Sequence, residues 1–160
     1  MKLIPADAMR RMPWKNGGGV TTEIAIAPAG ATLDHFDWRV STAQVDAAGP
    51  FSRFAGIDRS LAVIAGGRLT MHRAEAEAVT LAPGEAPARF PGEAAVHATL
   101  DAPLSDFNVM TRRDAWAHQA EAIALAAGER RSLPRLHAGM QWLVYCVHGV
   151  LSIGADDVPQ

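Results

Sequence analysis

Short runs of alternating apolar and polar residues constrain the fold of this chain more than any other feature. They occur at Val20–Ile26, Phe36–Val45 and Ser105–Arg112, with the period of two that is typical of half-buried strands. Ten prolines and fourteen glycines interrupt the chain between such runs. Two alanine-rich segments, 74–79 and 115–127, fit neither a helix nor a strand pattern cleanly, and we interpret them as strand or irregular structure. The sequence therefore predicts an all-β sandwich or barrel of short strands.

An internal repeat is the second informative feature. Residues 60–71 align without gaps to residues 142–153, so that Leu61 matches Leu143 and Gly67 matches Gly149. Each copy predicts a strand, a tight glycine turn and a second strand, which is the pattern of a hairpin. The match indicates either a duplicated barrel unit or a chance similarity between two apolar hairpins.

Charge and cysteine content exclude several classes of protein. Fifteen Lys and Arg residues against seventeen Asp and Glu residues give a net charge of −2, so no basic surface is available for nucleic acid. The single cysteine, Cys146, excludes an intrachain disulfide and cysteine-rich metal frameworks. The longest apolar run, 142–147, is too short to span a bilayer, and the first residues lack the apolar core of a signal peptide. We expect a cytoplasmic domain with no nucleic-acid or membrane partner.

Candidate ligand-binding residues begin at the glycine-rich segment Trp14–Gly19. Three consecutive glycines are present, but the spacing matches neither a P-loop nor a dinucleotide-binding fingerprint. The segment is therefore either a bulge that only glycine permits or a pocket wall, with Trp14 as the apolar surface and Asn16 as the polar group. The six histidines show no H-x-H or H-E-x-x-H spacing, so we expect no metal and no other cofactor.

Two predicted strands carry polar residues on one face. Asp106, Asn108 and Arg112 share one face, and Arg39 and Ser41 share the face opposite Trp38. These faces either meet solvent or line a barrel interior, where they would form a pocket. On the second interpretation, one face of the strand would serve the core and the other the site.

The segment 49–59 is either a surface turn or a loop packed against the core. Burial of Phe51 and Phe54 favours packing, because a buried Phe stabilises a fold by about 1.5–3 kcal/mol. A packed loop would fix Arg53 or Arg59 in place. An enclosed Arg39 or Arg59 then needs an acidic partner, for which Glu23, Asp58 and Asp106 compete with a ligand.

Four blocks in this order resemble the HutD/Ves family, and the resemblance covers roughly residues 1–150. The blocks are Met12–Ile24, Asp37–Ala43, Gly49–Arg59 and Asp106–Met110, with Ala55 where the family usually has Pro. The resemblance implies a cupin-superfamily fold of two fused barrels, a bicupin. The metal-binding motif of other cupins is missing. Only a lone His72 follows Gly67, and Pro91–His97 matches the second half of that motif only weakly, with the wrong spacing.

The family resemblance also implies a function, namely modulation of histidine utilisation by sensing a small acid such as formylglutamate or urocanate. Trp14 and Phe51 would be apolar walls, and Arg39 and Arg59 would bind the carboxylate. Asn16, Ser52 and Asn108 would orient the ligand. The full set of expected ligand-binding residues is Trp14, Asn16, Gly18, Glu23, Arg39, Ser41, Phe51, Ser52, Arg59, Asp106 and Asn108.

We therefore expect residues 1–160 to form one bicupin, with a first barrel centred on about 20–100 and a second, complete or incomplete, centred on about 101–155. We expect it to act as a non-catalytic regulator that binds a small carboxylated metabolite without metal, as a possible homodimer. One alternative is a metal-free cupin enzyme that acts on a small acid, with Asp106 or Glu23 as general base. The second alternative is a stress-related interaction module.

Overall fold

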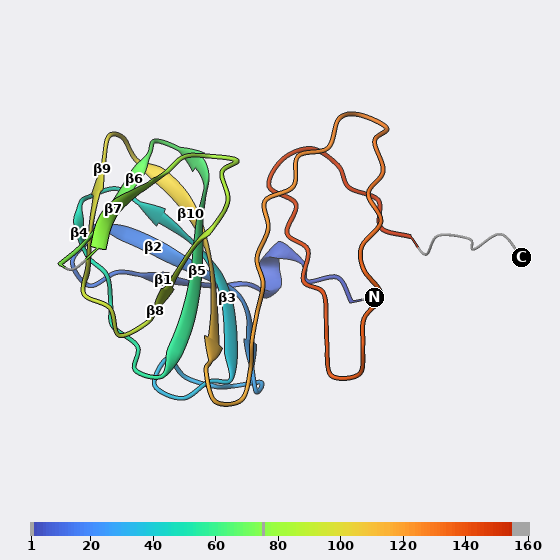
Figure 1. Ribbon diagram of the computed structural model, residues 1–160, viewed down its shortest axis with the longest axis horizontal. Coiled ribbons are helices and arrows are strands. Elements are labelled where there is room, and N and C mark those ends of the chain that lie inside the picture. The colour runs from blue at the N-terminus through green and yellow to red at the C-terminus, as the bar shows by residue number, and fades with distance from the viewer. Residues whose placement is uncertain (1, 75, 155–160) are drawn as a thin grey trace, which may run out of the picture. The chain divides into compact units, whose positions relative to one another are not determined.

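The computed structural model describes residues 2–74 and 76–154, and the chain divides into two units, residues 1–123 and 124–160. The first unit contains all the helices and strands assigned in the described residues (Figure 1). One 3-10 turn, η1 (Ala6–Ala8), precedes ten strands. These are β1 (Arg10–Pro13), β2 (Gly19–Ala27), β3 (Trp38–Val45), β4 (Gly49–Pro50), β5 (Ile57–Gly66), β6 (Leu69–Arg73), β7 (Ala76–Leu81), β8 (Ala88–Pro91), β9 (Val96–Leu100) and β10 (Leu104–Arg112). No described helix is long and apolar enough to cross a membrane.

Six strands form an antiparallel sheet in the order β1-β2-β3-β10-β5-β8. The three runs predicted from period-two alternation are its strands β2, β3 and β10, which confirms the all-β interpretation. Strand β10 is hydrogen-bonded between β3 and β5, so the first barrel extends beyond residue 100. It places Met110 opposite both Arg39 and Arg59.

The other four strands form a second antiparallel sheet in the order β4-β9-β6-β7. Its buried side chains share a core with those of the six-stranded sheet, and all of them are apolar. The four-stranded sheet contributes Leu69, Met71, Leu81, Val96 and Ala98. The six-stranded sheet contributes Ala43, Val45, Leu61, Val63, Phe90 and Leu104. The cupin-type arrangement of two facing sheets that the family resemblance implies is therefore present in the first unit.

The predicted hairpin at residues 60–71 is wrong. Strand β5 pairs with β10 and β8, whereas β6 pairs with β9 and β7, so the glycine turn carries the chain from one sheet to the other. Gly66 makes this crossing with φ +86°, and a Cβ there would lie 2.4 Å from the Pro103 carbonyl oxygen. The apolar residues on both sides of the turn face the same core, so their spacing resembles that of a hairpin although the strands do not pair.

The second copy of the repeat, residues 142–153, contains no assigned strand, and neither does any other part of 124–154. Large apolar side chains in this segment are exposed, among them Trp142, Val147 and Leu151. The expected strands at this position are therefore not formed, and the second barrel of a bicupin stays a prediction. The alanine-rich segment that begins at Ala115 is irregular, and the one at 74–79 overlaps β7, in agreement with their interpretation.

The crossing at Gly66 generates a stability prediction. Gly66→Ala should destabilise the fold more than Gly84→Ala, because both glycines have a positive φ but only Gly66 has backbone within 3 Å of an added Cβ. The conformational cost common to both variants is about 1–2 kcal/mol. Urea unfolding of the two variants measures the difference. Equal losses of unfolding free energy in the two variants would show that the added methyl group at Gly66 is accommodated beside Pro103 without further destabilisation.

Candidate functional site

The inner face of β3, β10 and β5 carries a buried polar cluster. The strand register places Arg39, Met110 and Arg59 in one row across the sheet. The next row holds Ser41, Asn108 and Leu61, and the one beyond it holds Ala43, Asp106 and Val63. The side chains of the polar members are all buried: Arg39, Ser41, Arg59, Asp106 and Asn108.

Of the two interpretations of these polar faces, the barrel interior is the one that the structure shows. One expectation is wrong, however, because core and polar residues do not occupy opposite faces of the strands. Asp106 and Leu104 alternate on the same inner face, and so do Arg59, Leu61 and Val63. The polar cluster lies along the strands between the main apolar core and a smaller one formed by Phe36, Ile57 and Met110. Arg112 lies beyond the cluster, half-buried, and donates to the Phe36 carbonyl.

Arg39 is held by an acidic residue of the neighbouring strand. Its Nε donates to Glu23 Oε2 at 2.7 Å, and the two side chains are only 6% and 11% exposed. A further nitrogen of Arg39 donates to Ser41 Oγ at 3.3 Å. Glu23 is thus the internal partner of Arg39 among the three acidic residues that the sequence offered.

Arg59 is held by aromatic rings and a carbonyl group instead. Its guanidinium lies 5.4 Å from the Phe51 ring centroid, 5.6 Å from that of Phe54 and 4.9 Å from that of Phe90, distances at which cation–π attraction is effective. One terminal nitrogen donates to the Ser52 carbonyl oxygen at 3.2 Å. Among the described residues Arg59 has no contact ion pair, and its buried Nε has no hydrogen-bond partner. Burial lowers the pKa of Arg59 to about 10, with Asp106 opposing the shift and Arg39 adding to it.

Asp106 and Asn108 supply the remaining polar groups. Burial raises the pKa of Asp106 to about 7, although attraction to Arg59 and a hydrogen bond from the Ala43 backbone oppose the shift. The Asn108 Oδ1 atom is buried and has no hydrogen-bond partner among the described residues. Asn108 and Met110 lie on the same face of β10, and Met110 is opposite Arg59. Arg59 and Asn108 are therefore diagonal neighbours on adjacent strands, and each has one buried polar atom without a hydrogen-bond partner.

The structure does not bring every expected residue into this cluster. Asn16 is exposed, and its Oδ1 accepts a hydrogen bond from the backbone of Gly18, which fixes the turn between β1 and β2. Trp14 donates to Thr21 Oγ1 at 2.8 Å and packs against the main core. Ser52 contributes its backbone carbonyl rather than its exposed side chain. Phe51 contributes its ring, which lies against the Arg59 guanidinium.

Phe54, which the sequence predicts to pack with Phe51, also lies against the Arg59 guanidinium. Two further residues near the site were not predicted from the sequence, Phe90 and His118, and Phe90 completes the set of aromatic rings around Arg59. His118 accounts for a second polar cluster, in which its Nδ1 lies 2.8 Å from Thr111 Oγ1 and its Nε2 lies 2.8 Å from Ser60 Oγ. Burial is the main cause that lowers the pKa of His118. No sequence spacing links His118 to Ser60, so only the fold reveals this contact.

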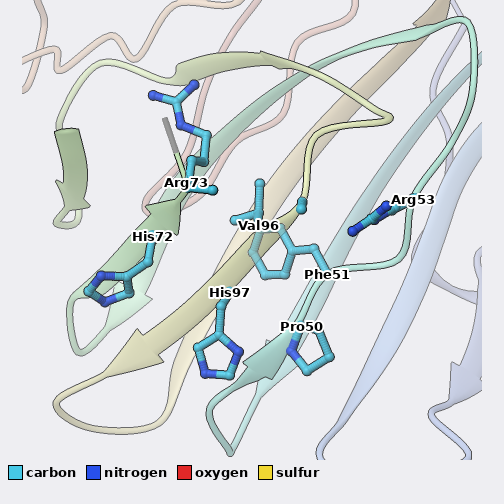
Figure 2. Close-up of a pocket in the computed structure, with 9 residues that line it drawn as sticks. Pro50, Phe51, Arg53, His72, Arg73, Val96 and His97 are labelled. Carbon is cyan, nitrogen blue, oxygen red and sulfur yellow. The ribbon is translucent and has the colours of Figure 1, made fainter. Parts of the chain in front are cut away.

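A surface hollow of about 390 Å³ lies beside the four-stranded sheet (Figure 2). Phe51 lines it and is its only member among the expected ligand-binding residues. His72 and His97 are directly opposed on β6 and β9, and both line this hollow (Figure 2). His72 Nε2 and Thr99 Oγ1 form a hydrogen bond of 2.9 Å. No group of three or more possible metal ligands occurs within residues 2–74 and 76–154, and a metal-free site stays a prediction.

Comparison with known proteins assigns the family. The sequence profile of the HutD family matches residues 6–159, which is nearly the whole chain. The chain belongs to the HutD family. It is 39% identical over 111 residues to an uncharacterised 21.2 kDa protein of the hutC 3′ region of Pseudomonas putida, covering 69% of this chain and 57% of that protein. It is 40% identical to protein Ves of Citrobacter koseri, covering 66% and 56% of the two chains.

Solved structures agree with this assignment. The chain is 39% identical to HutD from Pseudomonas fluorescens SBW25, with a TM-score of 0.59 and coverage of 66% of this chain and 57% of that one. KdgF from Halomonas is similar in fold alone, with a TM-score of 0.53 at 18% identity. This chain spans little more than half the length of the curated relatives that it matches.

The buried carboxyl group of Asp106 predicts how stability depends on pH. Its folded-state pKa is raised from 3.8 to about 7, so the folded state binds this proton more tightly than the unfolded state does. The contribution to stability is complete below about pH 4 and is lost as the pH rises to about 7. Asp106→Asn should remove this decline. Urea unfolding of both proteins at several pH values measures it, and parallel pH profiles would show that Asp106 is not the cause.

Proposed function

We propose that this HutD-family chain binds a small carboxylated metabolite in the interior of its barrel and acts as a regulator linked to histidine utilisation. The observation that carries the proposal is that the diagonal neighbours Arg59 and Asn108 each keep a buried polar atom, Nε and Oδ1, without a hydrogen-bond partner. Leaving a buried donor or acceptor unsatisfied is unfavourable, so native proteins normally pair such groups with protein, water or ligand. The name of the Pseudomonas putida relative, from the hutC 3′ region, supports the link to histidine utilisation.

The chemistry of the two unpaired atoms restricts which functional groups the ligand must carry. Arg59 Nε donates, so it requires an acceptor such as a carboxylate oxygen. Asn108 Oδ1 accepts, so it requires an N–H or O–H group a short distance from that carboxylate. Formylglutamate offers both groups through its carboxylates and amide N–H, and urocanate offers them through its carboxylate and ring N–H.

The first experiment compares ligand binding with stability. Arg59→Gln should weaken binding of N-formyl-L-glutamate or urocanate by about 1.5–3 kcal/mol, the range for hydrogen bonds that involve charged groups. Isothermal titration calorimetry measures the affinity, and thermal unfolding of the same samples shows that the variant is folded. Arg11→Gln is the matched control, because Arg11 is an exposed residue of β1 and its loss changes the net charge equally.

Two results would contradict the proposal. One is a wild-type protein that binds neither acid. The other is an Arg59→Gln variant that loses stability but binds as tightly as the wild type, which would make Arg59 a purely structural residue.

A second function is favoured by one observation, the pKa of Asp106 near 7. A carboxyl group with such a pKa is suited to general acid–base catalysis at neutral pH. On this alternative the barrel is a metal-free enzyme that acts on a small acid, with Asp106 rather than Glu23 as the base, because Glu23 is committed to Arg39. Proton NMR of N-formyl-L-glutamate and urocanate incubated with the protein decides between the two. Turnover that Asp106→Asn abolishes would establish an enzyme.

A further inference from the structure

The buried charges on the inner face of the six-stranded sheet balance one another when no ligand is bound. Arg39 forms a contact pair with Glu23, and Arg59 and Asp106 attract each other without a contact pair. With Asp106 ionised, two positive and two negative groups give a net charge of zero. A carboxylate that binds at Arg59 would then leave one negative charge uncompensated in a buried place, which is strongly unfavourable.

No other described group is placed to compensate that charge. The buried residues of the facing four-stranded sheet are all apolar: Leu69, Met71, Leu81, Val96 and Ala98. Arg73, at the end of β6, lines the surface hollow. Arg112 lies beyond the cluster and pairs with Asp37. Within the described chain, the charge balance therefore rests on the four groups Glu23, Arg39, Arg59 and Asp106.

Resting on the function proposed above, we propose that this site takes up a singly charged carboxylate together with one proton, and that Asp106 receives the proton. The proton comes from solvent, and no bond of the ligand changes. Protonation leaves a net charge of +1 on the four groups, which one carboxylate neutralises. It also turns Asp106 into a hydrogen-bond donor. The pKa of Asp106 near 7 is consistent with this step, because protonation then costs little at neutral pH.

Calorimetry of the wild-type chain tests the coupling directly. The probe is urocanate at pH values above about 7.5, where its carboxylate is ionised and its imidazole ring is neutral, so that it carries a single negative charge. Titrations in Tris and in HEPES, which differ in ionisation enthalpy, should show uptake of about one proton per bound ligand above the pKa of the free site. Over the same range the affinity should fall about tenfold per pH unit.

Variants assign the proton to Asp106. Asp106→Asn should bind the probe with an affinity that no longer depends on pH, since the amide imitates the protonated acid. Asp114→Asn, which removes an exposed carboxylate outside the cluster, should keep the wild-type slope. If Asp106→Asn does not fold, the proton count of the wild-type protein still decides whether uptake occurs.

The outcomes separate this inference from the function on which it rests. Binding with no proton uptake and no pH dependence would overturn the coupling and leave the carboxylate site intact. Uptake that persists in Asp106→Asn would overturn the assignment to Asp106. The absence of binding across the whole pH range would overturn both proposals.

Discussion

Arg39 and Arg59 are buried on the two strands that flank β10, and the surroundings of each account for much of the local structure. A buried guanidinium is tolerated only where opposite charge, hydrogen bonds or aromatic faces replace its water. Arg39 forms an ion pair with Glu23 of β2. Arg59 lies against three aromatic rings and donates a hydrogen bond to one carbonyl oxygen. The two solutions differ in one respect that matters for function, because only Arg59 keeps a buried donor without a partner.

The contacts of Arg59 also hold the segment between β4 and β5 against the barrel, although this segment has no regular structure. Phe51 and Phe54 pack on the guanidinium, and the Ser52 carbonyl accepts its hydrogen bond. The segment is closed against β8 by a hydrogen bond from Phe54 N–H to the Gly92 carbonyl oxygen. A Cβ on Gly92 would lie 2.5 Å from the Phe54 carbonyl oxygen, so this close approach requires glycine. Of the two interpretations of this segment, the loop packed against the core is therefore the one that the structure shows, with Phe51 and Phe54 half-buried.

The fold and part of the site could be predicted from the sequence, and the reason lies in what alternation encodes. A period of two reports that residues share a strand face, which was correct for Asp106 with Asn108 and for Arg39 with Ser41. It does not report which strands pair, and for this reason the turn at Gly66 was mistaken for a hairpin. Contacts between distant segments leave no local pattern. The Phe90 face of Arg59 and the contact of His118 with Ser60 could therefore not be foreseen.

The difference between the two acidic residues decides which of them can exchange a proton on ligand binding. Protonating Glu23 would break its 2.7 Å contact with Arg39 and leave that guanidinium without an opposite charge. Protonating Asp106 breaks no contact ion pair, because its attraction to Arg59 acts over a longer distance. It also removes a charge from a position beside Val63 and Ala43, where burial disfavours ionisation. Once Asp106 is neutral, the positive charge of Arg59 is no longer offset by it and can attract an incoming carboxylate. Glu23 therefore maintains the site, while Asp106 is the group whose charge changes with its occupancy.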